Sequence, residues 1–307
     1  MVVEKKVPQA LSPVRAARTE LVATMCRLVG IVASEITEFG LVLKEAPRSL
    51  ARLSREHPDG WGIAAHGGPG SIPPPSEQSP HHGVWRVHKG TNPAGECARF
   101  LEIASRSAGT VLIAHVRQKT VGPTSIENTH PFVRSGWVFA HNGTLVDHVA
   151  LRAETSPERL AQIQGDTDSE VLFAFLLTRL DAAGLSRVGT CPTAREEATR
   201  VLAVTTEELR TRRVGAFNFL LSDGSSCFVH RFGRSLFLLE RKRHESREAS
   251  AEPTPPSWTP RRQAVLVASE RLTEEPWTEV PDGSLLRLDG GPSPSIVWAG
   301  TPERVAS

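Results

Sequence analysis

Cys26 is the residue of this 307-residue chain best suited to nucleophilic chemistry, because it directly follows Met25, the only methionine besides Met1. A thiol attacks an electrophilic carbon efficiently only as the thiolate, and a free cysteine ionises near pH 8.5. A cysteine that begins a mature chain carries its own base, an α-amine with a pKa of about 7.7–8.0. That amine can take the thiol proton and later return it to a leaving group. Because an amide nitrogen is not basic, this chemistry requires Cys26 to be the first residue.

Four polar segments lie where predicted strands end. They are HPDGWG (57–62), AHVRQ together with NTHPF (114–132), AHNG (140–143) and GDTDSE (165–170). Taken singly, each has an ordinary structural explanation, since Asn-Gly is typical of a turn and Thr-Asp-Ser-Glu of a helix N-terminus. Taken together, and in this order behind a Met-Cys pair, they indicate one shared site.

Secondary-structure elements are predicted on both sides of these segments. Strands are expected at 26–33, 60–66, 84–89, 110–118, 136–143, 216–223, 226–232, 235–241, 264–270, 277–280 and 284–289. Helices are expected at 37–56 with a break at Pro47, at 92–107, at 167–184 behind a cap at Asp166 or Thr167, and at 193–211. Several strands are apolar throughout, which favours sheets covered by helices on one face and by a second sheet on the other. The predicted fold class is therefore a layered α+β architecture.

Composition excludes several classes of protein. Hydrophobic residues make up 39% and charged residues 23%, and the formal net charge of +2 gives no electrostatic argument for nucleic acid or a membrane as partner. No apolar run approaches the roughly 18 residues that span a bilayer. The four cysteines have neither disulfide-framework nor metal-ligand spacing, so we expect a reducing, cytoplasmic setting with no metal and no cofactor.

The chain is predicted to contain one domain at 26–289, with flexible loops at 66–80 and 241–262 and a C-terminal tail at 290–307. Residues 1–25 have basic residues but no apolar core of a signal sequence. Two explanations of this leader remain open. Either translation starts at Met25, which is then trimmed, or residues 1–25 are a propeptide that is removed.

The combined pattern resembles the class II glutamine amidotransferases, and it is especially similar to their stand-alone bacterial members. The resemblance rests on Met25-Cys26 and the four polar segments, and it runs to about Asp289. It implies the four-layer αββα sandwich of N-terminal-nucleophile hydrolases, in agreement with the layered α+β pattern.

The resemblance also implies roles for individual residues. Cys26 is the expected nucleophile, and the Asn142 side chain with the Gly143 backbone N–H forms the expected oxyanion hole. The guanidinium of Arg117 is expected to bind the α-carboxylate of glutamine, and the carboxylate of Asp168 its α-ammonium. Three further residues are expected to belong to the same pocket: His130, Asp59 and Gly60.

The predicted function is hydrolysis of the γ-glutamyl amide of glutamine, or of a γ-glutamyl conjugate, through a thioester on Cys26. No synthase domain is evident after residue 289, so ammonia either is released or passes to a separate synthase. The motifs recognise the glutamyl end and do not select the leaving group. The alternative is a non-catalytic binding or regulatory subunit that keeps the glutamine pocket, and the state of the nitrogen of Cys26 discriminates between the two.

Overall fold

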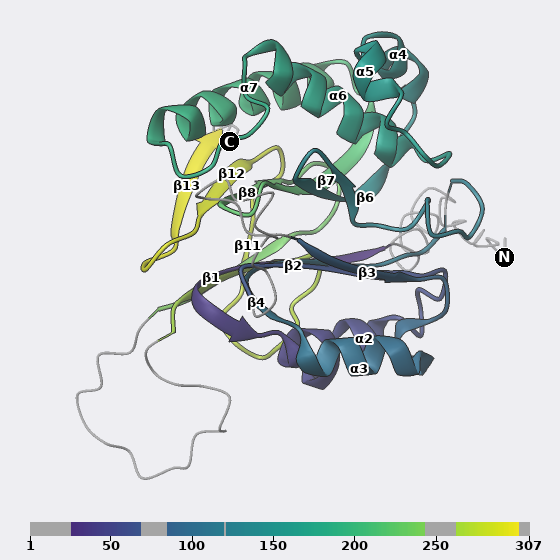
Figure 1. The fold of residues 1–307 in the computed structure, drawn as a ribbon, viewed down its shortest axis with the longest axis vertical. Coiled ribbons are helices and arrows are strands. Elements are labelled where there is room, and N and C mark those ends of the chain that lie inside the picture. Colours follow the sequence, from purple (N-terminus) through teal and green to yellow (C-terminus); the bar gives the residue numbers. More distant parts are fainter. Residues whose placement is uncertain (1–25, 69–84, 120, 243–261, 301–307) are drawn as a thin grey trace, which may run out of the picture.

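Two antiparallel sheets stacked face to face form the centre of the structure, a computed structural model that describes residues 26–68, 85–119, 121–242 and 262–300 (Figure 1). The first sheet has the order β11 (Thr278–Glu279), β9 (Phe237–Arg241), β10 (Ala264–Ala268), β1 (Arg27–Glu38), β4 (Ala108–Val116), β2 (Trp61–His66) and β3 (Arg86–Gly90). The second has the order β13 (Ser295–Gly300), β12 (Leu285–Asp289), β8 (Ser226–His230), β7 (Gly215–Ser222), β6 (Trp137–Leu145) and β5 (Phe132–Arg134).

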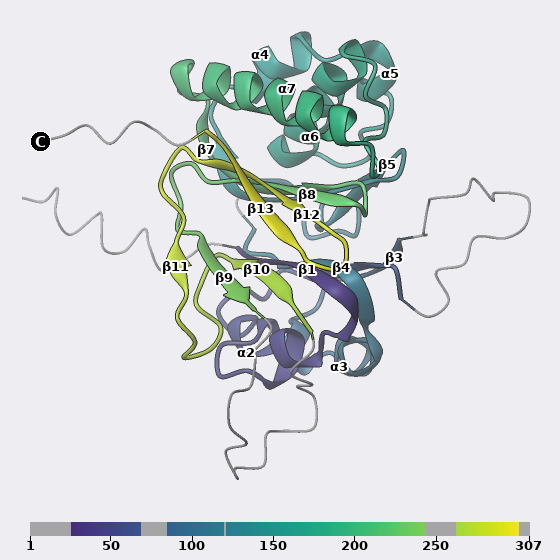
Figure 2. The same cartoon turned by 90° about the vertical axis from the view of Figure 1, so that its left-hand side faces the viewer.

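Helices cover the outer face of each sheet. The first sheet is covered by a π-helical turn η1 (Leu41–Glu45), α2 (Leu50–Leu53), the short η3 (Ala94–Glu96) and α3 (Ala98–Arg106). The second is covered by α4 (His148–Ala153), α5 (Pro157–Leu160), α6 (Asp168–Ala182) and α7 (Pro192–Thr211). Figure 2 shows the same succession of layers from a second direction. The predicted four-layer αββα sandwich is confirmed.

Strand alternation accounts for the three hydrophobic cores between the four layers. Along β1, Val29 and Ile31 pack toward α2 and α3, whereas Leu28 and Val32 pack between the sheets. Successive side chains of a strand point to opposite faces, so a strand buried on both faces reads as a continuous apolar run. The layer between the second sheet and its helices is the most aromatic of the three.

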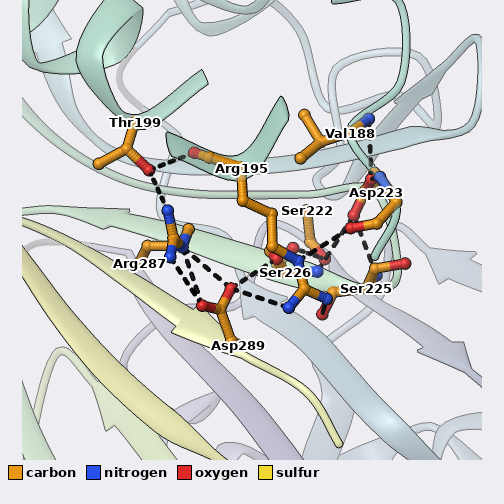
Figure 3. Close-up of polar contacts among 10 residues, drawn as sticks. Val188, Arg195, Thr199, Ser222, Asp223, Ser225, Ser226, Arg287 and Asp289 are labelled. Carbon is orange, nitrogen blue, oxygen red and sulfur yellow. Dashed lines mark hydrogen bonds and ion pairs between the residues drawn. The ribbon is translucent and has the colours of Figure 1, made fainter. Parts of the chain in front are cut away.

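A buried polar network fastens α7 to the second sheet (Figure 3). Arg287 on β12 donates from Nη1 to the hydroxyl of Thr199 on α7 at 2.8 Å and pairs with Asp289 at 2.9 Å. Asp289 also accepts the hydroxyl of Ser226 at 2.8 Å and lies 3.7 Å from Arg195 of α7. Each charged group has a partner, as burial of charge requires.

The sequence-based boundaries differ from the structure at several places. Strand β1 continues to Glu38 through a register shift, so the helix predicted at 37–56 is reduced to η1 and α2 on either side of Pro47. The tail predicted at 290–307 contains β13, which pairs with β12 and extends the sheet to Gly300. β5, α4 and α5 were not predicted, because segments of three to six residues carry little periodicity.

Four predicted segments lie wholly or partly outside the described residues: the leader at 1–25, most of the loop at 66–80, most of the loop at 241–262 and residues 301–307 of the tail. Within the described part of the chain, no helix combines the length and apolar character needed to cross a bilayer.

Candidate active site

Cys26 lies immediately before β1, a central strand of the first sheet. Its Sγ is 3.2 Å from both the backbone N and the backbone O of Gln118, which follows β4. Burial raises the pKa of the Cys26 thiol, against the opposing effects of the Gln118 hydrogen bond and the positive charge of Arg117. No side-chain base in the described residues is hydrogen-bonded to Sγ of this partly buried cysteine, so none of those side chains is placed to take the thiol proton.

Arg117, Asp59 and Gly60 form one cluster beside Cys26. The backbone N of Arg117 donates to Gly60 O at 2.8 Å, and the backbone N of Asp59 donates to Arg117 O at 3.1 Å. The Asp59 carboxylate accepts the backbone N–H of Lys119 at 2.8 Å. Gly60 has a φ of +134°, a conformation that side-chain-bearing residues rarely adopt. This geometry fixes the chain on both sides of Gln118.

The Arg117 side chain is buried, with 3% of the residue exposed, and its guanidinium is held by its own loop. Nη1 donates to the carbonyl of Pro123 at 3.0 Å and Nη2 to that of Val121 at 2.8 Å. Burial lowers the pKa of Arg117, while the nearby Cys26 and Asp59 act in the opposite direction. A guanidinium has five N–H donors, so further donors remain for an anion.

Asn142 and Gly143 lie within β6, where they pair with Asn218 and Phe217 of β7. The turn that an isolated Asn-Gly pair suggests is therefore wrong here. Gly143 has no room for a side chain, because a Cβ would collide with the carbonyl oxygen of Ala216. Since β6 lies across from β1 and β4 in the sandwich, these residues belong to the sheet that faces Cys26.

Asp168 is the first residue of α6, and it is bonded to the same strand β6. Its Oδ2 accepts the backbone N–H of Leu145 at 2.7 Å, two residues beyond Gly143, and its Oδ1 accepts that of Ser169 at 3.0 Å. Thr167 is the N-cap, with its hydroxyl accepting the N–H of Glu170 at 3.3 Å. A carboxylate at this helix end is favoured by the macrodipole.

His130 belongs to a group of three buried histidines. Its ring centroid is 4.5 Å from that of His115 and 6.5 Å from that of His141, which in turn bonds through Nδ1 to the Ser169 hydroxyl at 2.8 Å. Burial lowers the pKa of His130 well below its usual value and that of His115 to about 3. These rings are neutral at neutral pH. Within the described residues they are not arranged to hold a metal ion.

Some residues that shape the site carried no distinctive sequence signal. Gln118 contacts Cys26 through its backbone, which any residue type supplies. His141 and Ser169 lie inside the AHNG and GDTDSE segments, which indicate the site but no individual role for these two residues. The same holds for Asn128 in the NTHPF segment.

This chain has the architecture of the N-terminal-nucleophile hydrolase class, a four-layer αββα sandwich with a cysteine directly before a central strand. Within that class, the family model described as "Glutamine amidotransferases class-II" matches residues 25–306. The chain belongs to this family.

Individual relatives agree with this assignment. A protein of Escherichia coli named as a glutamine amidotransferase is 32% identical over 213 residues, which is 65% of this chain and 70% of that one. A crystal structure of a predicted glutamine amidotransferase from Pseudomonas aeruginosa superposes with a TM-score of 0.53 at 26% identity, over 89% of this chain and 99% of that one. The phosphoribosylpyrophosphate amidotransferase of Bacillus subtilis shares the fold, with a TM-score of 0.55 at 20% identity over 90% of this chain and half of that enzyme.

Proposed function

We propose that the chain hydrolyses the γ-glutamyl amide of glutamine, or of a γ-glutamyl conjugate, through a thioester on Cys26. The observation that carries this proposal is the position of Cys26 Sγ, at the head of β1 and 3.2 Å from the backbone of Gln118, in a chain of the class II glutamine amidotransferase family. Arg117, which directly precedes Gln118 in the chain, provides the positive charge that a glutamate-like substrate requires.

The free α-amine of Cys26 is the proposed base. It accepts the thiol proton, and the thiolate attacks the amide carbon to give a tetrahedral oxyanion. The protonated amine then donates its proton to the departing nitrogen as the C–N bond breaks, which leaves the γ-glutamyl thioester and ammonia or an amine. A water molecule, deprotonated by the same amine, cleaves the thioester and regenerates the thiol.

The Asn142 side-chain amide and the Gly143 backbone N–H are the proposed donors to the oxyanion. Burial of Asn142, which is 4% exposed, and the close backbone contact between Gly143 and Ala216 support this role, because both hold donors in fixed positions. Donors fixed before the reaction stabilise developing charge without reorganisation.

Arg117 is the proposed partner of the substrate α-carboxylate, and Asp168 that of the α-ammonium. Asp59 and Gly60 are proposed to hold Arg117 and Gln118 in place, since their contacts with this segment are made by backbone groups and the Asp59 carboxylate. His130 is proposed as a neutral structural member of the pocket wall, in keeping with its burial. The leaving group is released as ammonia or an amine, and a separate synthase is one destination for ammonia.

Selective labelling by a glutamine-mimicking electrophile tests this function. Protein whose chain begins at Cys26 should be labelled once and should release glutamate from glutamine, whereas Cys26→Ala should do neither. Cys191→Ala is the matched control, because Cys191 is exposed and a hydrogen bond from Thr193 lowers its pKa, which makes it the competing reactive thiol. Labelling of Cys191 instead, with Cys26 untouched and no glutamate formed, would favour a non-catalytic binding subunit.

A further inference from the structure

We propose that Asn128 is a positioning residue that sets the distance between the two ends of the glutamyl pocket. Its side chain joins the loop that carries Arg117 to the loop that leads into Asp168. This inference rests on the proposed function for the roles of Arg117 and Asp168, while the contacts themselves belong to the fold.

Asn128 makes one hydrogen bond in each direction. Its Nδ2 donates to the carbonyl of Pro123 at 3.1 Å, and its Oδ1 accepts the backbone N–H of Asp166 at 2.8 Å. The residue is 1% exposed, so neither bond is replaced readily by water. A primary amide is the side chain that provides one donor and one acceptor in this way, whereas an ionised carboxylate only accepts.

On the first side, Asn128 shares its anchor with Arg117. The Pro123 carbonyl that receives Nδ2 of Asn128 also receives Nη1 of Arg117 at 3.0 Å. A carbonyl oxygen has two lone pairs, so both donors are accommodated. Displacement of Asn128 therefore alters the position of the group that orients the guanidinium.

On the second side, the bond to Asp166 lies two residues before Asp168. The preceding Gly165 donates its N–H to Glu170 at 2.6 Å, so Glu170 and Asn128 hold two successive N–H groups just before α6. The chain passes so close to Asn128 that a Cβ on Gly165 would collide with Oδ1. Tight backbone passage of this kind gives the asparagine control over where α6 begins.

A second glycine supports the same interpretation. Gly122, in the Arg117 loop, has a φ of +73°, and a Cβ there would lie 2.9 Å from Nδ2 of Asn128. Both loops thus approach one amide through residues that lack side chains. Because Arg117 follows a strand of the first sheet and Asp168 begins a helix that covers the second, a shared link is what fixes their separation.

Steady-state kinetics of protein that begins at Cys26 tests the proposal, with glutamine and two truncated analogues as substrates. One analogue lacks the α-amine and the other lacks the α-carboxylate. In Asn128→Leu, which keeps the branched side-chain shape and has no polar atoms, the KM for glutamine should rise about 10- to 100-fold while kcat changes less than about threefold. The preference for glutamine over both analogues should fall together.

Asn128→Asp separates the two bonds. It keeps an acceptor for Asp166 but directs a second oxygen toward the Pro123 carbonyl, so the bond on the Arg117 side is lost. The preference for substrates with an α-carboxylate should therefore fall more than the preference for substrates with an α-amine. Equal losses of the two preferences in Asn128→Asp would overturn the proposed division of the contacts.

Asp223→Ala is the matched control. Asp223 also joins two loops, since its carboxylate accepts the N–H groups of Val188 at 3.2 Å and Ser225 at 2.9 Å (Figure 3), but it lies outside the proposed pocket. The Asp223→Ala variant should have a lower free energy of unfolding, with the KM for glutamine and the preference over the two analogues unchanged. A KM unchanged in Asn128→Leu, or raised equally in Asp223→Ala, would contradict a positioning role.

Hydrogen exchange separates this inference from the proposed function. Asn128→Leu should speed amide exchange in both 121–128 and 164–168, and Asp223→Ala should leave these segments unchanged, whether or not the protein cleaves glutamine. If the wild-type protein lacks glutaminase activity but exchange rises in both segments, the function fails and the link between the loops stands. Unchanged exchange in either segment would disprove the link.

Discussion

At the scale of single residues, the Cys26 thiol is held in its protonated form by the structure. Sγ has a backbone acceptor and a backbone donor, both from Gln118, and burial outweighs the neighbouring Arg117 charge, so the pKa is raised. Loss of the proton turns the contact with the Gln118 carbonyl from attractive to repulsive. In the proposed reaction, the α-amine of the same residue takes this proton as the sulfur attacks the substrate.

Asn142→Ala is expected to lower kcat about 10²- to 10³-fold with little change in KM, because the lost donor acts on charge that exists only in the transition state. Steady-state rates of glutamate release, with circular dichroism to verify folding, measure this effect. A kcat within about threefold of wild type would exclude Asn142 as an oxyanion donor.

The candidate residues with distinctive chemistry could be selected from the sequence, and the contacts that support them could not. Cys26, Arg117 and Asp168 stood out because a thiol, a guanidinium and a carboxylate occurred in characteristic segments. The role of Gln118 depends on the thiol of Cys26, and that of Asn128 depends on the backbone N–H of Asp166. Each partner lies more than 30 residues away along the chain, which no local pattern encodes.

At the scale of elements, the start of α6 depends on a buried ion pair that joins this helix to strand β5 of the second sheet. Arg134 of β5 donates to Glu170 of α6 at 2.7 Å, with 2% of the Glu170 side chain exposed. Oε1 of Glu170, which pairs with Arg134, also accepts the N–H of Gln164, and Oε2 accepts the N–H of Gly165. Glu170 therefore holds the loop that precedes Asp168.

Glu170→Ala is expected to lower the free energy of unfolding by about 3–5 kcal/mol, because it leaves a largely buried guanidinium without its carboxylate partner. Urea denaturation monitored by fluorescence measures the loss. Glu102→Ala is the control, since its pair with Arg106 on α3 is exposed and should contribute little. Similar losses in the two variants would contradict the importance of burial.

Elements were predicted where periodicity was long and missed where it was short. The 15-residue α6 followed from the sequence with a cap at Asp166 or Thr167, of which the structure has Thr167. Its low amphipathicity reflects burial on nearly all sides. Pairing with β12 makes 295–300 a strand, even though its exposed edge position gives it a weak pattern. Long-range pairing of this kind overrides local preference.

At the scale of the whole molecule, buried neutral histidines make stability depend on acid. Burial lowers the pKa values of His115 and His230 to about 3 each, whereas an unfolded histidine ionises near 6.5. The unfolded chain therefore binds protons first as pH falls. The stabilisation is fully present above pH about 6.5 and is lost progressively toward pH 3.

Unfolding is expected to take up at least about two protons between pH 6 and 5, which corresponds to a loss of roughly 2.7 kcal/mol per pH unit. Urea denaturation at several pH values gives this slope. His230→Gln should reduce the slope by about one proton, because it removes a histidine that is neutral in the folded protein and protonated in the unfolded chain. His230 lies in the second sheet, where its ring is bonded to the Ser284 carbonyl at 2.9 Å. A free energy of unfolding that stays constant over this range would refute buried neutral histidines.

The layered α+β architecture followed from apolar strands and clustered helices, because sheets buried on both faces admit few arrangements, and the family resemblance implied the four-layer αββα form. The order of strands within each sheet did not follow, since β10 pairs with β1 although more than 200 residues separate the two strands in the chain. Sequence patterns indicate which face of a strand is buried, whereas packing in the folded protein determines which distant strand pairs with it.

The most direct measurement compares two forms of the protein that differ only in the nitrogen of Cys26. In one form the chain begins at Cys26, and in the other Met25 is retained. With glutamine and rapid acid quenching, mass spectrometry should find a γ-glutamyl group on the Cys26 peptide of the first form, together with steady glutamate release, and neither in the second. Equal glutamate release by both forms would contradict the central claim that the α-amine of Cys26 is the catalytic base.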